Sequence, residues 1–122
     1  MTGGNYLFWE DVFDPIPQNA DLLEITTRAM RLACDEIYVL PAMDSILIRL
    51  YRKQDELKSY ELHRSRLPAL VRCLKLFAHL RRTARGRAME GNLHIRFEEK
   101  DRNIFVRVVQ TSVGERVYLR IL

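Results

Sequence analysis

The chain has 122 residues, of which 48% are hydrophobic, 30% charged and 9% aromatic, a composition typical of one globular domain. These values exclude a disordered, collagen-like or low-complexity chain. With 20 Lys and Arg against 16 Asp and Glu, the formal charge of +4 makes the chain mildly basic.

Residues 1–18 are interpreted as an N-terminal arm. Pro15 and Pro17 prevent a helix from continuing through this segment. Four aromatic anchors precede them, namely Tyr6, Phe8, Trp9 and Phe13. The arm is expected either to dock on another protein, with Phe8 and Trp9 as the contacts, or to pack against its own domain.

The first helix is predicted to begin at residue 19 and to end near residue 35, with Asn19 as its cap. Its buried face is predicted from five apolar residues at helical spacing: Leu22, Ile25, Ala29, Leu32 and Ala33. Three strands then follow at residues 37–40, 45–52 and 57–62, and a polar turn at residues 53–56 joins the last two.

The second helix is predicted to begin with Ser65 as its cap and Pro68 in its first turn. Its apolar stripe consists of Leu67, Leu70, Val71, Leu74, Phe77 and Ala78. After a loop at residues 85–87, three alternating strands are predicted at residues 93–97, 104–109 and 116–121, with turns at residues 101–103 and 113–115.

This order of elements predicts an α+β domain over residues 19–122. Its antiparallel sheet would contain about six strands and would be backed by two main helices. Within the strand at residues 104–109, alternation puts Phe105, Arg107 and Val109 on the face opposite to Ile104, Val106 and Val108.

The charges are unevenly placed along the chain. Residues 1–44 carry eight acidic residues but only Arg28 and Arg31, whereas residues 62–89 carry eight Lys or Arg and no acidic residue. This pattern indicates either a basic face toward an anionic partner or an ordinary solvated helix face.

Most catalytic patterns are missing from the 122 residues. The glycines form no phosphate-binding loop, and no serine lies in a nucleophile elbow. His63, His79 and His94 lack the spacing of a zinc helix, so no metal site is expected. We therefore expect that this chain alone is not an enzyme and binds no cofactor.

The compartment is expected to be the cytoplasm. No stretch approaches the roughly 18 to 20 apolar residues of a membrane-spanning helix, and the N-terminus has no signal-peptide pattern. Cys34 and Cys73 are isolated within apolar helical patterns, which favours free thiols in a reducing environment. A disulfide between them is the alternative.

RNA binding would require exposed aromatic residues beside Lys or Arg. Phe97 and Phe105 lie in the apolar phase of their strands and are interpreted as core residues, while Tyr118 stays ambiguous. No specific nucleic-acid partner is therefore expected.

The C-terminal residues resemble a known pattern. Residues 103–122, which read NIFVRVVQTSVGERVYLRIL, are similar to the end of the N-terminal domain of the type II secretion and type IV pilus-assembly ATPases. In that family, a strand D-x-R-V-S and a turn precede G-E-[RK]-V-V-x-R-[IL]-L.

Three further segments agree in order and spacing across about residues 19–122. Residues 20–41 are similar to the family's helix that runs into A-S-D-I-H-I-E-P, and residues 48–52 (IRLYR) resemble its V-R-[FY]-R strand. Residues 85–87 (RGR) stand where the family has Q-D-G-R-I. The chain departs from the family by an extra residue near Glu36, by Gln54-Asp55 in place of Asp-Gly, and by a shorter turn after Arg107.

The resemblance implies a PAS-like domain that moves against an ATPase motor domain and brings arginines to the phosphates of bound nucleotide. Arg107 matches the arginine of D-x-R-V-S and Arg120 the arginine before [IL]-L; Arg49, Arg52 and Arg87 are further candidates. A guanidinium offers paired donors to phosphate. Without the resemblance, these residues fit ordinary strand arginines whose stems cover apolar surface.

The resemblance further implies a cytoplasmic hexamer when the motor is attached, with ATP and Mg in the motor and with inner-membrane platform proteins of a secretion or pilus system as partners. The 122 residues contain no motor domain. Two other functions stay open: a standalone protein–protein adaptor without ATPase activity, and an RNA-binding domain.

Overall fold

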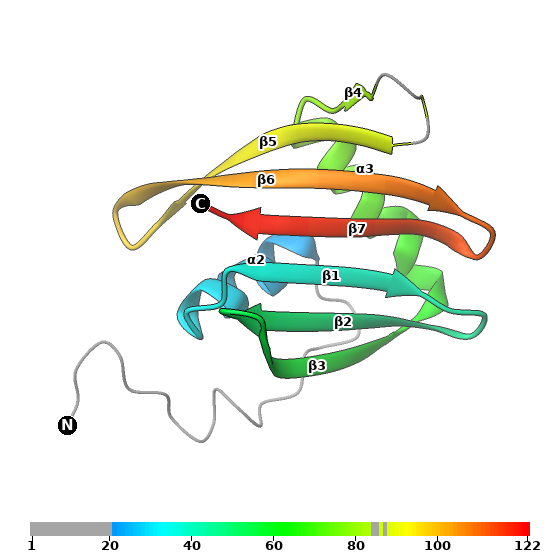
Figure 1. Ribbon diagram of the computed structural model, residues 1–122, viewed down its shortest axis with the longest axis horizontal. Coiled ribbons are helices and arrows are strands. Elements are labelled where there is room, and N and C mark those ends of the chain that lie inside the picture. Colours follow the sequence, from blue (N-terminus) through cyan, green and yellow to red (C-terminus); the bar gives the residue numbers. More distant parts are fainter. Residues whose placement is uncertain (1–20, 84–85, 87) are drawn as a thin grey trace.

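The structure is a computed structural model that describes residues 21–83, 86 and 88–122 (Figure 1). It is an α+β domain in which a seven-stranded antiparallel sheet carries two helices on one face. The elements are α2 (Leu22–Arg31), β1 (Glu36–Pro41), β2 (Ser45–Arg52), β3 (Asp55–His63), the 3₁₀ turn η1 (Arg64–Arg66), α3 (Leu67–Phe77), β4 (Arg81–Arg82), β5 (Ala88–Phe97), β6 (Lys100–Thr111) and β7 (Gly114–Ile121).

The strand order across the sheet is β3-β2-β1-β7-β6-β5-β4. Two units of consecutive antiparallel strands, β1–β3 and β5–β7, therefore meet where β1 pairs with β7. Figure 1 shows this central pair, with the C-terminal strand β7 lying beside the cyan β1. The middle of the sheet is thus made from strands at opposite ends of the described chain.

The predicted class and the two main helices are confirmed, and the strand count is one higher than about six. The additional strand is β4, whose two residues pair with Met89 and Glu90 of β5. This strand was not predicted, because two residues are too few to show a hydrophobic period in the sequence.

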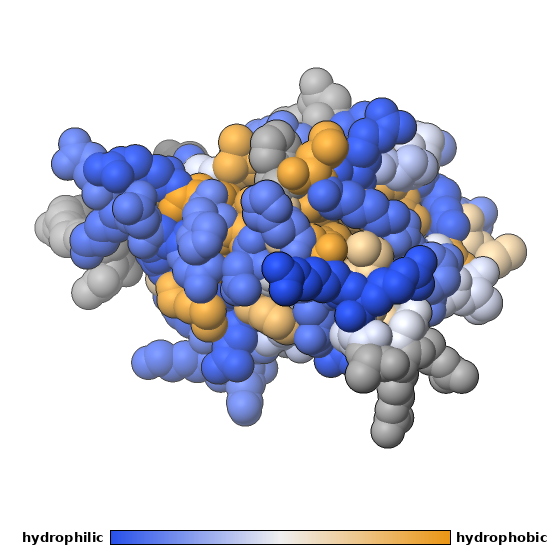
Figure 2. All heavy atoms as spheres, turned by 90° about the horizontal axis from the view of Figure 1, so that it is seen from above, coloured by the Kyte–Doolittle hydropathy of each residue, from blue (hydrophilic) through white to orange (hydrophobic). Residues whose placement is uncertain are grey.

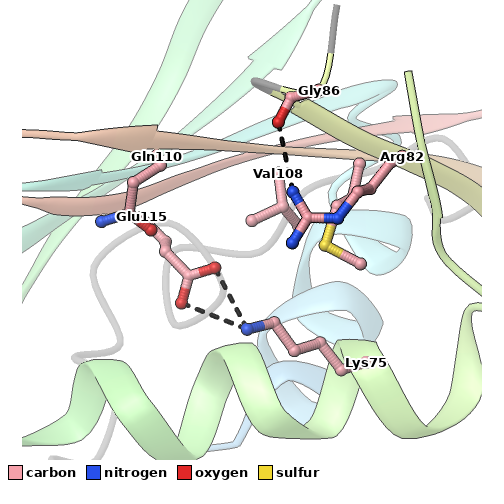
Figure 3. Close-up of a pocket in the computed structure, with 7 residues that line it drawn as sticks. Lys75, Arg82, Gly86, Val108, Gln110 and Glu115 are labelled. Atoms are coloured by element: carbon pink, nitrogen blue, oxygen red, sulfur yellow. Dashed lines mark hydrogen bonds and ion pairs between the residues drawn. The ribbon is translucent and has the colours of Figure 1, made fainter. Parts of the chain in front are cut away.

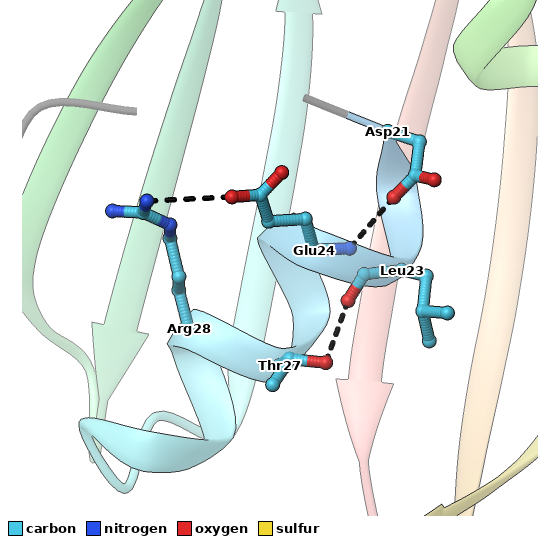
Figure 4. Close-up of polar contacts among 5 residues, drawn as sticks. All are labelled: Asp21, Leu23, Glu24, Thr27 and Arg28. Carbon is cyan, nitrogen blue, oxygen red and sulfur yellow. Dashed lines mark hydrogen bonds and ion pairs between the residues drawn. The ribbon is translucent and has the colours of Figure 1, made fainter. Parts of the chain in front are cut away.

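Several predicted boundaries are wrong for local reasons. The N-cap of α2 is Asp21, whose Oδ1 accepts a hydrogen bond from the Glu24 N–H at 2.8 Å (Figure 4), while Asn19 lies outside the described residues. Ser65 is not a helix cap, because it lies within η1 and bonds the His63 ring. The β5–β6 turn falls at residues 98 and 99, which both have positive φ, and not at 101–103.

The core lies between the helices and one face of the sheet. Alternate strand residues are fully buried there, including Ile37, Val39, Ile48, Leu50, Ile104, Val106 and Leu119. Leu22, Ile25, Ala29 and Leu32 of the predicted first helical stripe are buried, but Ala33 is exposed because the chain turns there with a φ of 59°. Burial of these apolar side chains is the main favourable contribution to the free energy of folding.

Both cysteines are free thiols. Cys34 is buried, and desolvation raises its pKa from the ordinary 9.0 to about 11. The charge of Arg52 lowers this pKa and the charge of Asp35 raises it, both by less than desolvation does. Cys73 on α3 is partly exposed, and desolvation followed by the nearby Asp21 carboxylate also raises its pKa.

Candidate functional site

The sheet face opposite the two helices, here called the open face, brings together side chains from four strands. In β2, β1, β7 and β6, the register aligns Arg49 with Tyr38, Tyr38 with Tyr118, and Tyr118 with Arg107. Adjacent strands are about 4.8 Å apart, so this row extends roughly 14 Å across the sheet, with an arginine at each end and two tyrosines between them.

A second row lies directly beside the first. Glu36 of β1 pairs with Tyr51 on one side and Arg120 on the other, and Arg120 pairs in turn with Phe105 of β6. The two rows contribute four aromatic rings and three arginines to one surface.

The aromatic rings form a continuous chain of contacts, called the aromatic row below. Tyr38 packs edge-on against Tyr51 with ring centroids 5.3 Å apart, and lies 5.1 Å from Tyr118. Tyr118 in turn meets Phe105 at 6.4 Å. Edge and tilted contacts at these distances are favourable arrangements for aromatic pairs.

Hydrogen bonding holds the centre of the aromatic row in place. The Tyr118 hydroxyl donates a short hydrogen bond to the Glu36 carboxylate. Burial, followed by this bond, raises the pKa of Tyr118 well above its ordinary value of 10.0, and burial with the Glu36 charge raises the pKa of Tyr38. Both tyrosines therefore present neutral hydroxyls at neutral pH.

The arginines of the open face differ in whether they form ion pairs. Arg49 Nε lies 3.3 Å from a Glu56 carboxylate oxygen, and Arg107 Nη1 lies 3.5 Å from Glu90, in two half-exposed ion pairs. Arg116 and Arg120 are exposed and form no ion pair with another described residue. Two guanidinium groups on this face are therefore available to an anion without breaking an existing pair.

Two shallow hollows shape the open face around this cluster. A hollow of about 340 Å³ lies toward β2 and one of about 220 Å³ toward β6. They share Tyr38, Leu40 and Arg116, so Arg116 can reach a ligand in either hollow.

Three of the five arginines singled out in the sequence lie on the open face: Arg49, Arg107 and Arg120. Arg52 does not join them, because its Nη1 donates to the Leu32 carbonyl at the end of α2 at 3.5 Å. Arg87 and the predicted docking residues Phe8 and Trp9 lie outside the described residues.

The aromatic row was not predicted from the sequence, and the assignment of Phe105 to the core is wrong. Phe105 lies on the open face against Tyr118, whereas Phe97 packs against the core as predicted. The alternation along β6, which puts Phe105 on the same face as Arg107, was the signal in the sequence that could have predicted this position of Phe105. The joining of β1 to β7, which brings Tyr38 to Tyr118, has no local signature in the sequence.

A larger cavity of about 610 Å³ lies on the helix side of the sheet, between α3 and the ends of β6 and β7 (Figure 3). Its cations are already engaged: Lys75 Nζ lies 3.2 Å from Glu115 Oε2, and Arg82 donates to the Gly86 carbonyl at 3.3 Å. The open face therefore offers the better anion site.

In residues 21–83, 86 and 88–122, no group of three or more His, Cys, Asp or Glu side chains is arranged to hold a metal ion. Within the same residues, neither helix combines the length and the apolar character that are needed to cross a bilayer. Comparisons with protein-family models and with curated proteins find no match to this chain.

Proposed function

We propose that this chain is a regulatory domain of a secretion or pilus-assembly ATPase, and that the open face presents arginines to the phosphates of nucleotide bound in the motor domain. The observation that carries the proposal is the common face of Arg49, Arg107 and Arg120, which the family resemblance had selected from separate strands. Arg116 adds a fourth guanidinium beside them.

The chemistry of the open face fits this role. Guanidinium groups offer fixed, paired donors to phosphate and neutralise charge that develops during phosphoryl transfer. A phosphate would compete with Glu56 for Arg49 and with Glu90 for Arg107. Exposed ion pairs contribute only about 0.2–1 kcal/mol each, so this competition costs little.

The order of elements supports a PAS-like arrangement. A helix precedes β1–β3, a second helix precedes the remaining strands, and both helices lie on one face of the sheet. The opposite face is then available for a motor domain of the same chain or of a neighbouring subunit in a hexamer. The proposal includes ATP and Mg in the motor, a cytoplasmic location, and inner-membrane platform proteins as further partners.

The first test is to read the source gene beyond the codon for Leu122. A reading frame that continues into a G-x-x-x-x-G-K-[ST] loop supports the proposal. A stop codon would instead leave a domain without a motor and would favour the standalone adaptor.

The second test measures ATP hydrolysis by the protein that carries this domain. Arg107→Ala and Arg120→Ala are each expected to lower kcat by about ten-fold or more, because an arginine on the transferred phosphate typically contributes about 10³ or more. Arg72→Ala, on the exposed side of α3, is the control and is expected to have no effect. Unchanged hydrolysis in both strand variants would reject the role of these arginines.

The aromatic row favours one second candidate, which is binding of single-stranded RNA. Stacking of bases on exposed rings contributes about 1–3 kcal/mol per base, and neighbouring arginines contact the backbone. Fluorescence anisotropy of a labelled single-stranded RNA tests this candidate with wild-type protein and Phe105→Leu. Binding that falls steeply with salt and weakens in the variant would support it, and absence of binding at low salt would reject it.

A further inference from the structure

A second surface, independent of the open face, lies where α2, α3 and β5 meet. It is a groove of about 490 Å³, within the range of about 300–1,000 Å³ that is usual for small-ligand pockets. Its lining is largely apolar and includes Leu22, Leu23, Cys73, Leu74, Leu93 and Ile95. We refer to it as the α2–α3–β5 groove.

The groove leaves hydrophobic side chains at the surface. Leu23, which lines the groove, is 52% exposed and points away from the body of α2 (Figure 4). Figure 2, which views the molecule from the side of β4 and β5, shows hydrophobic atoms between hydrophilic ones on this side. The exposed Leu23 side chain and the apolar lining together form hydrophobic surface that a covering segment would bury.

The groove also borders a strand edge. Among the described residues, β4 pairs only with Met89 and Glu90, and the Asn92 N–H donates to the Ala78 carbonyl at 3.1 Å, so no strand pairs with the outer edge of β5 from Leu93 to Phe97. Proteins commonly cover such an edge with a loop or a helix, because unpaired backbone groups invite pairing with other chains.

The arm defined by residues 1–18 is attached at this groove. Asp21, which lines the groove, is the first described residue and the N-cap of α2. Phe13 and Trp9 precede Asp21 by 8 and 12 residues, which span up to about 26 Å and 40 Å when extended. A short tether of this kind gives a local concentration in the millimolar range.

The composition of the arm complements the groove. The arm carries Tyr6, Phe8, Trp9 and Phe13, and each such side chain can bury about 150–250 Å². Its charges are acidic, from Glu10, Asp11 and Asp14, without a Lys or Arg.

The chain near the groove is rich in basic residues, although the groove lining itself carries one carboxylate, that of Asp21. Residues 62–89 contain eight Lys or Arg and no acidic residue; among them, Arg72 precedes Cys73 on α3 and Arg81 follows His79 by two residues, and both are exposed. The aromatic residues of the arm therefore match the apolar lining, and its acidic residues match the net positive charge of residues 62–89.

We propose that residues 6–13 of the same chain fold back over the α2–α3–β5 groove and bury Trp9 there. The arm is then an intramolecular cover of the apolar surface and of the β5 edge. This proposal is independent of nucleotide and of the open face.

Fluorescence of the full chain tests the proposal directly, because Trp9 is the single tryptophan. In the native chain, Trp9 emission is expected at shorter wavelength than in urea and with several-fold weaker quenching by acrylamide. Leu23→Gln, which places an amide in the groove without a new charge, is expected to shift the emission toward that of the unfolded chain. Met43→Gln, at a site 80% exposed and outside the groove lining, is the matched control.

The reactivity of Cys73 gives a second readout that does not depend on tryptophan. A disulfide reagent should modify Cys73 several-fold faster in Trp9→Ala than in the wild-type chain, because the arm no longer covers the groove. Cys34 is buried and should react only after unfolding. Gln18→Ala, in the arm but outside the aromatic segment, should react at the wild-type rate.

Three results would overturn the proposal. The first is native Trp9 emission and quenching equal to those in urea, and the second is Cys73 reactivity unchanged by Trp9→Ala. The third is protection that increases with protein concentration, which would show that a second copy of the chain supplies the cover. None of these measurements uses nucleotide, so failure here leaves the proposed function untouched.

Discussion

Tyr38 and Tyr118 lie directly opposite each other on β1 and β7, with ring centroids 5.1 Å apart and ring planes inclined by 52°. Tyr118 also donates a hydrogen bond to Glu36, which belongs to the same strand as Tyr38. This group of three side chains therefore fastens the two halves of the sheet to each other on the open face.

Replacement of Tyr118 by Phe removes the hydrogen bond to Glu36 and keeps the ring contacts. We expect the free energy of unfolding to fall by about 1 kcal/mol, the usual net contribution of one such bond. Urea titration followed by circular dichroism measures this change. Tyr51→Phe is the control, because the Tyr51 hydroxyl bonds no other described residue, and an equal loss in both variants would contradict the assignment.

Replacement of Gly91 by Ala should lower the free energy of unfolding more than replacement of Gly86 by Ala. An added Cβ at Gly91 would lie 2.3 Å from the Ala78 carbonyl oxygen, which is backbone and cannot turn aside. We expect a loss of about 2–3 kcal/mol in stability. Gly86 has a φ of +72° with no atom within 4 Å of the added Cβ, so Gly86→Ala should cost only about 1 kcal/mol.

The pH dependence of stability should carry a contribution from Cys34. In the unfolded chain this thiol ionises near pH 9, whereas burial raises its pKa in the folded chain to about 11. The contribution is therefore fully present below pH 9 and is lost as the pH rises toward 11, by roughly 2 kcal/mol in total.

Comparison of wild type with Cys34→Ala isolates this contribution. The free energy of unfolding of the variant, measured by urea titration between pH 8 and 11, should decline less steeply than that of the wild type. Cys73→Ala should change the slope less, because Cys73 is partly exposed. Parallel pH profiles for wild type and Cys34→Ala would show that burial does not hold the thiol protonated.

The first turn of α2 should depend on its cap. Asp21→Ala removes the acceptor for the Glu24 N–H and is expected to lower stability by about 1 kcal/mol, while Asp21→Asn should restore most of it. Thr27→Ala removes a bond from the threonine hydroxyl to the Leu23 carbonyl within the same helix, and should cost little because Ala is the better helix former. Thermal unfolding compares the three variants, and an Asn variant as unstable as the Ala variant would argue against capping.

The parts of the fold that follow from local periodicity were predictable. The apolar spacing identified most of the buried residues of both helices, with Ala33 as an exception, and the alternation in β6 correctly separated Arg107 from Ile104, Val106 and Val108, although it did not prevent the assignment of Phe105 to the core. These predictions succeed because the residues that face the core recur at a regular spacing in each helix and strand. Their apolar pattern can therefore be recognised within that segment of the sequence.

The parts that depend on contacts between distant segments were not predictable. The Arg81–Arg82 strand exists only because β5 lies beside it, and the turn at residues 98 and 99 uses two glutamates with positive φ in place of the usual turn residues. The candidate site has the same character. Its arginines could be selected by resemblance, but the aromatic row forms only when β1 and β7 pair.

The central position of β7 has a consequence for synthesis on the ribosome. Residues 114–121 are made last among the seven strands, yet they fill the gap between β1 and β6. Until they emerge, the nascent chain displays two unmatched strand edges that could pair with neighbouring chains. Translation must therefore deliver the last strand before the domain is protected from aggregation, and premature termination before residue 114 would leave two half-sheets with no partner between them.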